Sequence, residues 1–352
     1  MEGSRDLDPV AMLHLGEQGL APRVYYAESD KESPLCGLTV MDAVDGKNFW
    51  EAGFSEPYME AAGRLLRAVN EQPQEVLHDG RLKKKKEAIE AMEGWGKDIS
   101  YLSKTEVELV EEEFGSYPLM LLEGLGDSRK RLRNVEGYAD MEEWRREEEL
   151  LLRSYTPEPL LLKKVVFLHG GNLMMTRTDG AVAIDFEATA TGPGSVDLGA
   201  FVNRDDPFGK NGLIIKPGMS RADREALARG YLGEQEQEGE MKRLLYDIEI
   251  GMLQRTNFLT LLTYSWIFER MEALSAKKKM FYKWRLRRQM ESIRTSLKYR
   301  EMGLELLERA REDPDLMEDV IENGINNIVL RKYRKCLVCY CCDCCYICYY
   351  II

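Results

Sequence analysis

Two oxygen-bearing side chains flank a short β-hairpin pattern, and together they suit a magnesium ion. The hairpin pattern runs from Asn172 to Asp185, and the Asp179-Gly180 pair near its middle is a strong signal for a tight turn. Asn172 and Asp185 are symmetric about that turn, so we expect them to face each other about 5 Å apart at Cα. Mg²⁺ takes one or two protein oxygens and fills its shell with water and substrate phosphates. The alternative interpretation is that the two residues only cap strand ends.

The elements before this hairpin pattern form a small β-rich region. The sequence predicts a helix over residues 8–18, which Asp8 begins and Gly19 ends. The strand-like runs PRVYYA and GLTVMDAV follow, and a polar stretch separates them as in a hairpin. The buried strand KKVVFLHGG leads directly into the hairpin pattern.

The remaining parts of the chain have helical periodicity. Apolar residues recur at helical spacing from about residue 48 to residue 154, and again from about residue 220 onward. The basic run at 83–86 is interpreted as a solvated helix face, with a nucleic-acid patch as the alternative. The architecture expected is therefore a β-rich piece followed by a mainly helical piece that carries one hairpin.

Composition limits the classes of protein. The 352 residues include 49 basic and 61 acidic ones, for a net charge of −12, which argues against bulk binding to nucleic acid. The hydrophobic share of 44% is sufficient for a sizeable core. No apolar run reaches about 18 residues and the first residues lack a signal-peptide core, so we expect no membrane span and no secretion.

Cysteine is concentrated at one end of the chain. Only Cys36 precedes residue 336, and seven more fall between Cys336 and Cys348, so the body has no disulfide framework and fits a reducing, cytoplasmic setting. For the segment 331–352, four interpretations stand: translated non-coding sequence, palmitoylation beside the basic RKYRK run, a thiolate metal cluster, or a disordered tail.

Several of these segments together resemble the choline/ethanolamine kinases, which belong to the superfamily of aminoglycoside phosphotransferases and protein-kinase-like enzymes. The IDFE motif at 184–187, with Asp197 twelve residues after its Asp, resembles their metal-binding segment. VVFLHG resembles the strand that leads into their catalytic loop, and GLAPRVY resembles a junction in their N-terminal lobe. MDAVDG at 41–46 resembles the hinge between their lobes.

The resemblance implies roles for four residues of the catalytic centre. Asp185 would bridge Mg²⁺ to the β- and γ-phosphates of ATP, and Asn172 would hold a second metal position. His169 would orient the catalytic loop, and Asp197 would brace that loop from below.

The resemblance also implies two binding regions. Backbone groups of Asp42 and Val44 would bind adenine. An aromatic and acidic box would hold the cation of an amino alcohol, where each aromatic face contributes about 0.5–2 kcal/mol. The candidates for this box are Trp266, Tyr264, Tyr282 and Glu187. A plain core tryptophan is the alternative for Trp266.

One departure from the family pattern concerns the catalytic loop. The family has His-x-Asp, four residues and then Asn, whereas this chain has His169-Gly170-Gly171-Asn172 and lacks the Asp that would accept the proton of the attacking hydroxyl. Three residue steps span roughly 10 Å at most, against about 24 Å for seven. Loss of a positioned general base typically costs about 10²–10⁴ in rate, so weak turnover is compatible with this loop.

A second departure concerns the N-terminal lobe. By the resemblance, the chain starts within the helix that normally carries the Glu of a Lys–Glu ion pair, so we expect the phosphate-covering loop and the Lys to have no counterpart. We therefore expect an α+β, two-lobed protein-kinase-like fold with an incomplete N-terminal lobe and a mainly helical C-terminal lobe. The expected parts are a partial lobe and hinge at 1–46, a helical lobe with the catalytic hairpin at 47–330, and a Cys-rich tail at 331–352.

The function that follows is ATP-dependent phosphorylation of choline or ethanolamine, the first step in making phosphatidylcholine or phosphatidylethanolamine. The expected cofactors are Mg²⁺ and ATP, the expected partners are the nucleotide and a small amino alcohol, and the resemblance allows a homodimer. Two alternatives stand beside it: a catalytically dead, kinase-like binding or regulatory protein, and a related small-molecule kinase that acts on another alcohol.

Overall fold

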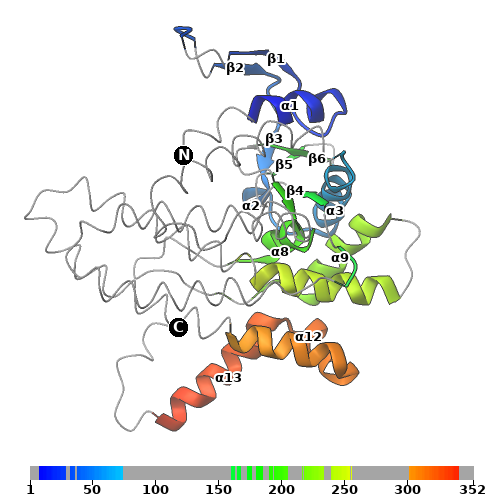
Figure 1. The fold of residues 1–352 in the computed structure, drawn as a ribbon, viewed down its shortest axis with the longest axis vertical. Coiled ribbons are helices and arrows are strands. Elements are labelled where there is room, and N and C mark those ends of the chain that lie inside the picture. Colours follow the sequence, from blue (N-terminus) through cyan, green and yellow to red (C-terminus); the bar gives the residue numbers. More distant parts are fainter. Residues whose placement is uncertain are drawn as a thin grey trace, which may run out of the picture. The chain divides into compact units, whose positions relative to one another are not determined.

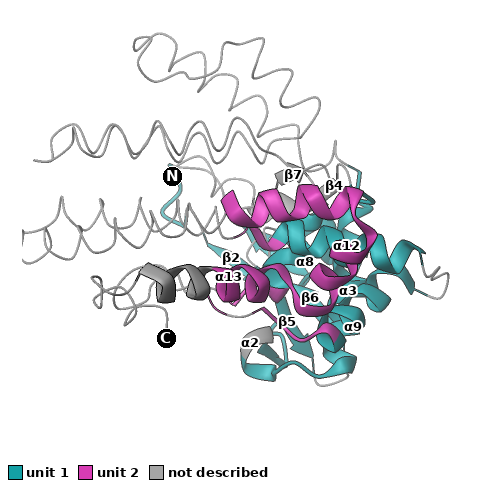
Figure 2. Cartoon of the chain, turned by 90° about the horizontal axis from the view of Figure 1, so that it is seen from below, with its two compact units in different colours: residues 1–117, 159–201, 222–251 teal, residues 118–158, 202–221, 252–352 magenta. Residues whose placement is uncertain are grey.

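The fold was described from a computed structural model of the chain. The residues that it describes are 8–28, 32–35, 38–73, 160–162, 165–167, 173–176, 180–184, 190–192, 194–204, 216, 218–233, 239–253, 255 and 301–340. The chain forms two compact units, one from residues 1–117, 159–201 and 222–251 and the other from 118–158, 202–221 and 252–352 (Figure 2). The boundaries of these units do not coincide with the boundaries expected at residues 46 and 330. The division into two lobes and a tail stays a prediction.

The first unit opens with the predicted helix and hairpin. Helix α1 spans Asp8–Glu17 and ends at Gly19, whose φ of 72° suits glycine. Its end is a Schellman motif, because the N–H of Leu20 donates to the carbonyl of Leu15 and the N–H of Gly19 donates to that of Gly16. Strands β1 (Val24–Ala27) and β2 (Thr39–Met41) then pair antiparallel, as predicted (Figure 1).

A three-stranded sheet with the order β3-β5-β6 follows in the same unit. It joins β3 (Gly46–Asn48) to the predicted hairpin, which is formed by β5 (Leu173–Thr176) and β6 (Ala181–Ala183), and both pairings are antiparallel. Gly46 lies so close to the backbone of Met175 that an added Cβ would overlap the Met175 carbonyl oxygen. This close approach explains the glycine at the start of β3.

A separate strand pair brackets this hairpin. Strand β4 (Val165–Phe167) confirms the predicted strand before the hairpin, and it pairs antiparallel with β7 (Ala190–Gly192). Phe167 and Ala190 are cross-strand partners, so the 22 residues between them begin and end at adjacent points.

Helices pack beside these strands in the first unit. The helices are α2 (Phe49–Ala52), α3 (Glu56–Asn70), α8 (Ser195–Val202), α9 (Arg221–Leu232) and a helical segment at 239–253, of which Val202, Arg221 and residues 252–253 are assigned to the second unit. Helices α3 and α9 approach closely at two glycines, since a Cβ on Gly63 would meet the backbone of Leu227, and one on Gly230 would meet that of Glu60. Small residues at a helix crossing allow such backbone proximity.

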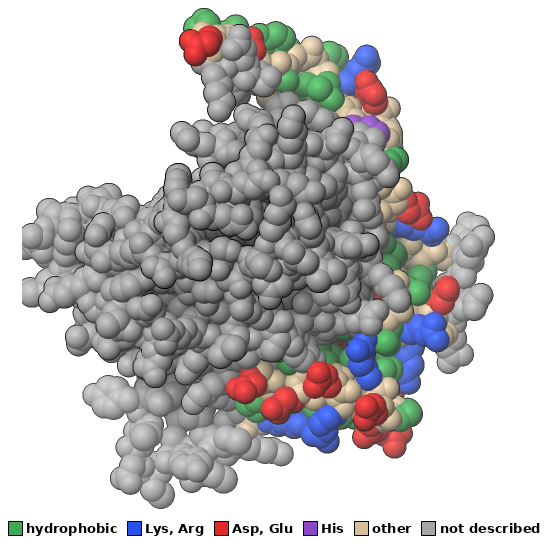
Figure 3. All heavy atoms as spheres, viewed as in Figure 1, with side chains coloured by type: hydrophobic (Ala, Val, Ile, Leu, Met, Phe, Trp, Pro, Cys, Tyr) green, Lys and Arg blue, Asp and Glu red, His purple; other side chains and the backbone are tan. Residues whose placement is uncertain are grey.

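The described part of the second unit is mainly helical. It contains residues 301–312, α12 (Pro314–Asn323) and α13 (Ile325–Tyr340), and the Asp313 carboxylate caps α12 by accepting from two backbone N–H groups. Arg221 forms ion pairs with Glu318 and Glu322 of α12. Acidic and basic side chains lie close together on the face drawn in Figure 3.

Helix α13 extends past residue 331, where the composition of the chain changes. It continues without a break to Tyr340, so the compositional boundary at 331 is not a boundary of secondary structure. The physical reason is that the helix hydrogen-bond pattern tolerates the change in side-chain type. Residues 341–352 lie outside the described part. No helix among the described residues has both the length and the apolar character needed to cross a bilayer.

Candidate functional site

The segment predicted to bind adenine links two sheets. Residues 42–45 join the end of β2 to the start of β3 and lie outside regular secondary structure. The N–H of Asp42 donates to the carbonyl of Arg23 over 2.9 Å. Among the hydrogen bonds of the described residues, the Asp42 carbonyl and the Val44 N–H take no part. One acceptor and one donor on this segment can therefore face the polar edge of a heterocycle.

The side chain of Asp42 has its own partner. The hydroxyl of Tyr25 in β1 donates to the Asp42 carboxylate over 2.7 Å, and this hydrogen bond raises the pKa of Tyr25. Arg23 lies 5.7 Å from the centroid of the Tyr25 ring, within the range of a cation–π contact. These exposed contacts hold the start of the segment against the β1–β2 hairpin.

The predicted metal hairpin is present, but its register differs from the prediction. Met174 pairs with Val182, which centres the ladder on residue 178 instead of between 178 and 179. The Thr176 N–H donates to the Gly180 carbonyl over 2.9 Å, so three residues close the turn where the Asp-Gly signal favoured two. Asn172 and Asp185 lie outside the described residues. Their direct pairing therefore stays a prediction. If the described ladder continued without a break, Ile184 and not Asp185 would lie opposite Asn172.

The other predicted site residues divide into two groups. The structure places Asp42, Val44 and Asp197. The remaining candidates lie outside the described residues, and they are His169, Asn172, Asp185, Glu187, Tyr264, Trp266 and Tyr282. Within the described ranges, no cluster of three or more His, Cys, Asp or Glu side chains could hold a metal ion.

Asp197 is buried in the first turn of α8. Its side chain is fully excluded from solvent, and its Oδ2 accepts a hydrogen bond from the Nδ2 of Asn70 over 3.3 Å. The Oδ1 of Asn70 accepts from the hydroxyl of Tyr231 over 3.0 Å. Burial, together with the Asp197 carboxylate, raises the pKa of Tyr231. A buried polar chain thus joins α8, α3 and α9.

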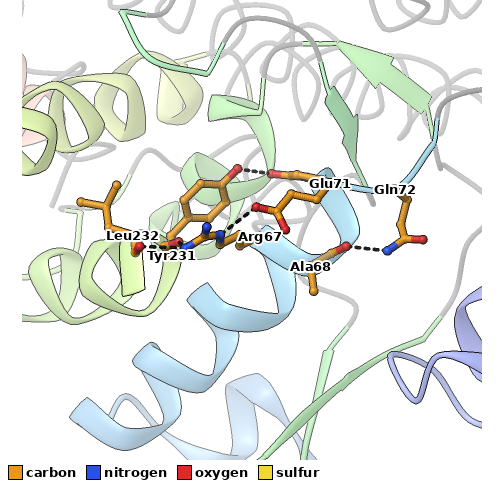
Figure 4. A network of polar contacts seen from close by, with 7 residues as sticks. Arg67, Ala68, Glu71, Gln72, Tyr231 and Leu232 are labelled. Carbon is orange, nitrogen blue, oxygen red and sulfur yellow. Dashed lines mark hydrogen bonds and ion pairs between the residues drawn. The ribbon is translucent and has the colours of Figure 1, made fainter. Parts of the chain in front are cut away.

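The end of α3 also holds the end of α9 (Figure 4). The Nη1 of Arg67 donates to the carbonyl of Leu232 over 2.8 Å, and its Nε donates to Glu71 over 2.8 Å. Figure 4 shows the Tyr231 ring beside the Arg67 side chain, with its hydroxyl directed to the end of α3. Arg67 thereby satisfies carbonyl groups that a helix end leaves without partners.

A second buried carboxylate lies on the segment 239–253. Asp247 accepts hydrogen bonds from three consecutive backbone N–H groups, those of Leu160, Leu161 and Leu162, at 2.6, 2.8 and 3.0 Å. Its side chain is fully buried. These donors offset the cost of removing a charged group from water.

Sequence reasoning missed Asn70 and Asp247. Asn70 gave a usable signal, because it is a polar residue on the apolar face of an amphipathic helix and buried polar groups need partners. Asp247 gave none, since its partners are backbone groups 85 to 87 residues earlier in the chain.

The predicted adenine segment comes directly before the sheet that contains the β5–β6 hairpin. Strand β3 follows directly after residues 42–45, and it pairs with β5, whose first residue comes directly after Asn172. An arrangement of this kind can present a backbone edge to a base and oxygen ligands to phosphates.

The chain is similar to known proteins in both sequence and structure. The Phosphotransferase enzyme family (APH) matches residues 11–242. No curated protein sequence matches the chain. Plasmodium vivax ethanolamine kinase is similar in structure, with a TM-score of 0.50 and 13% identity over 83% of this chain and 75% of that one.

Two further solved structures are similar at lower scores. Choline kinase from Cryptosporidium parvum has a TM-score of 0.45 and 12% identity, over 92% of this chain and 80% of that one. A choline/ethanolamine kinase family protein from Mesorhizobium loti has a TM-score of 0.40 and 15% identity, over 83% of each chain.

The family match confirms both the predicted superfamily and the predicted α+β, protein-kinase-like fold class with its mainly helical C-terminal part. The match includes the adenine segment, the hairpin, α8 and α9, and it extends over well more than half of the chain. The chain therefore belongs to the Phosphotransferase enzyme family.

Proposed function

We propose that the chain binds ATP with Mg²⁺ and transfers the terminal phosphoryl group to the hydroxyl of choline or ethanolamine. The observation that carries this proposal is the β3-β5-β6 sheet, which joins residues 42–45 to the hairpin that leads to Asn172 and Asp185. Membership of the phosphotransferase family supports the reaction class. The choice of amino alcohol rests on the IDFE motif and the aromatic residues near Trp266.

The nucleotide would lie against the segment 42–45. The Asp42 carbonyl would accept from an exocyclic amine, and the Val44 N–H would donate to a ring nitrogen. The Asp42 N–H is already bonded to Arg23, which fixes the peptide plane before it. Backbone recognition of this kind depends on chain geometry and leaves side-chain identity free.

The metal would be held by Asn172 and Asp185, whose oxygen atoms are of the type that Mg²⁺ binds. Leu173 and Ala183, which come one residue after Asn172 and two before Asp185, are cross-strand partners in the described ladder. The ion would neutralise charge on the transferred phosphoryl group and orient it. Positioning and electrostatics would supply the rate, because the His169–Asn172 loop has no Asp to serve as base.

The substrate cation would contact the box formed by Trp266, Tyr264, Tyr282 and Glu187. A cytoplasmic location fits the presence of a single cysteine, Cys36, in the first 335 residues, because a body without a disulfide framework suits a reducing setting. A homodimer remains part of the proposal.

A second candidate function is a binding or regulatory protein that keeps the fold without turnover. The shortened His169–Asn172 loop favours it. It predicts that a four-residue insertion with an Asp after Gly170 leaves activity unchanged, whereas an impaired kinase would gain activity from that insertion.

A coupled assay of ADP release tests these alternatives. We expect Mg²⁺-dependent ADP release that choline or ethanolamine stimulates, and we expect Asp185→Asn to abolish it. An aminoglycoside in place of choline tests the alternative in which another alcohol is the acceptor. Saturable ATP binding with no stimulated release at high enzyme concentration would support the binding protein and contradict the kinase.

A further inference from the structure

Three consecutive peptide N–H groups converge on one buried carboxylate. The Oδ1 of Asp247 accepts from Leu160, and its Oδ2 accepts from Leu161 and Leu162, all within 3.0 Å. Residues 160–162 lie outside helix and strand, so neither a ladder nor a helix supplies acceptors for these donors. The Asp247 carboxylate replaces secondary structure as the partner of this stretch of backbone.

The position of this stretch gives the contact its importance. Residues 160–162 come shortly before β4, and β4 pairs with β7 along three residues from Val165 to Phe167. The predicted catalytic loop follows directly after Phe167. Whatever fixes residues 160–162 therefore sets where β4 begins and from which point the loop departs.

We propose that Asp247 is a positioning residue for phosphoryl transfer: its carboxylate fixes the backbone of residues 160–162 and so places β4 and the loop after it. The part of this inference that concerns transfer rests on the proposed function. The part that concerns the backbone does not, because the hydrogen bonds are present whatever reaction the chain performs. Asp247 touches neither substrate nor cofactor in this role.

The same helical segment offers a matched control. Glu249 lies two residues after Asp247 and is also fully buried, but it forms an ion pair with Arg224 of α9. Glu249→Gln and Asp247→Asn each replace one buried carboxylate by an amide of the same size. Only Asp247→Asn takes away a carboxylate oxygen that accepts hydrogen bonds from the backbone N–H groups of residues 160–162. The amide NH₂ group that replaces this oxygen is itself a donor and would point its hydrogens at those N–H groups.

The experiment combines amide hydrogen exchange with steady-state kinetics on the full-length chain. In the unaltered protein, we expect the amides of residues 160–162 to exchange as slowly as those in the core helices. In Asp247→Asn, we expect exchange in a peptide covering them to rise about tenfold or more, since one charge-assisted hydrogen bond is worth at least that factor. We expect kcat to fall by a larger factor than KM for ATP rises, because residues 42–45 are held by other contacts.

Glu249→Gln should lower the melting temperature similarly but leave exchange at 160–162 and kcat near those of the unaltered chain. Equal exchange at 160–162 in the two variants would overturn the proposal, and so would equal loss of kcat. If Asp247→Asn does not fold, Asp247→Glu, which keeps the charge, takes its place in the same measurements. Fast exchange at 160–162 in the unaltered chain would by itself refute the proposal. If the chain has no transferase activity yet exchange rises only in Asp247→Asn, the backbone role holds and the proposed function fails.

Discussion

Asn70→Asp is predicted to make the stability of the protein depend strongly on pH. In the native chain, the Nδ2 of Asn70 donates to the Asp197 carboxylate over 3.3 Å, and both residues are buried. The substitution keeps the size of the side chain and replaces the donor by a second carboxylate. Two buried carboxylates at this distance cannot both be ionised at low cost, so the pair takes up one proton.

The magnitude follows from the separation. Two unit charges 4 Å apart repel by about 4 kcal/mol at an effective dielectric constant near 20, which corresponds to roughly three pKa units. The pKa of the introduced carboxyl is thus raised in the folded chain well above its unfolded value of about 3.9, because the ionised Asp197 carboxylate lies beside it. Because the folded pKa is raised, the protonated variant is fully stable below pH 4 and loses stability as pH rises toward 7. Relative to the native chain, we expect a loss of about 1.5 kcal/mol at pH 5 and about 4 kcal/mol at pH 8.

Protonation should restore the native pattern of hydrogen bonds. A protonated carboxyl at position 70 can donate to Asp197 and still accept from the hydroxyl of Tyr231, as the amide does. The assay is urea unfolding of both proteins from pH 4.5 to pH 8, with the difference in unfolding free energy plotted against pH.

Asn323→Asp is the matched control. The Nδ2 of Asn323 donates to the Asp319 carboxylate over 2.8 Å, but this hydrogen bond is exposed. Water screens the same like-charge pair there, so the loss should stay near 1 kcal/mol or less at pH 8. A flat pH profile for Asn70→Asp, or one no steeper than that of Asn323→Asp, would refute the reasoning from burial.

Two more predictions concern the contact of α3 with α9. Burial and the Asp197 carboxylate raise the pKa of Tyr231, so the contribution of its neutral hydroxyl to stability is complete below pH 10 and is lost as pH rises above 10. Between pH 9 and pH 11, the free energy of unfolding should therefore fall less steeply for Tyr231→Phe than for the native chain. Equal slopes would contradict this prediction. Gly230→Ala puts a Cβ onto the backbone of Glu60 and should destabilise the protein by about 1–3 kcal/mol, whereas Gly239→Ala meets nothing within 4 Å and should be neutral or stabilise by about 0.5–1 kcal/mol, as thermal melts would measure.

Local signals predicted the local structure well. The Gly19 stop and the apolar spacing after Asp8 predicted α1 to within one residue of its end. The alternating runs predicted β1, β2 and the β5–β6 hairpin, because strand pairing across a short turn depends on residues that are close in sequence. The centre of the predicted β5–β6 register differs from the observed centre by half a residue, because three residues separate Thr176 from Gly180 in the turn. The Asp-Gly pair alone does not determine the length of the turn.

The candidate site could be predicted only in part. The sequence pattern put Asp42 and Val44 at the end of the strand-like run GLTVMDAV, and the family resemblance put them in a hinge; in the structure β2 already ends at Met41, and both residues lie between it and β3. The pairing of β3 with β5, which brings residue 46 beside residue 176, joins segments 130 residues apart and has no local signature. Predicted residues such as Asn172, Asp185 and Trp266 lie outside the described part and stay predictions.

The sequence by itself determined the family, because residues 11–242 match the Phosphotransferase enzyme family, and it determined short elements such as α1 through turn and cap residues. Only the tertiary structure decided which buried polar groups meet. Asp197 accepts a hydrogen bond from Asn70, which lies 127 residues earlier in the chain, and Asp247 accepts hydrogen bonds from the backbone of residues 160–162. The physical reason is that a buried charge must acquire partners wherever packing brings donors, and packing is set by the whole chain and not by the neighbours of the charged residue.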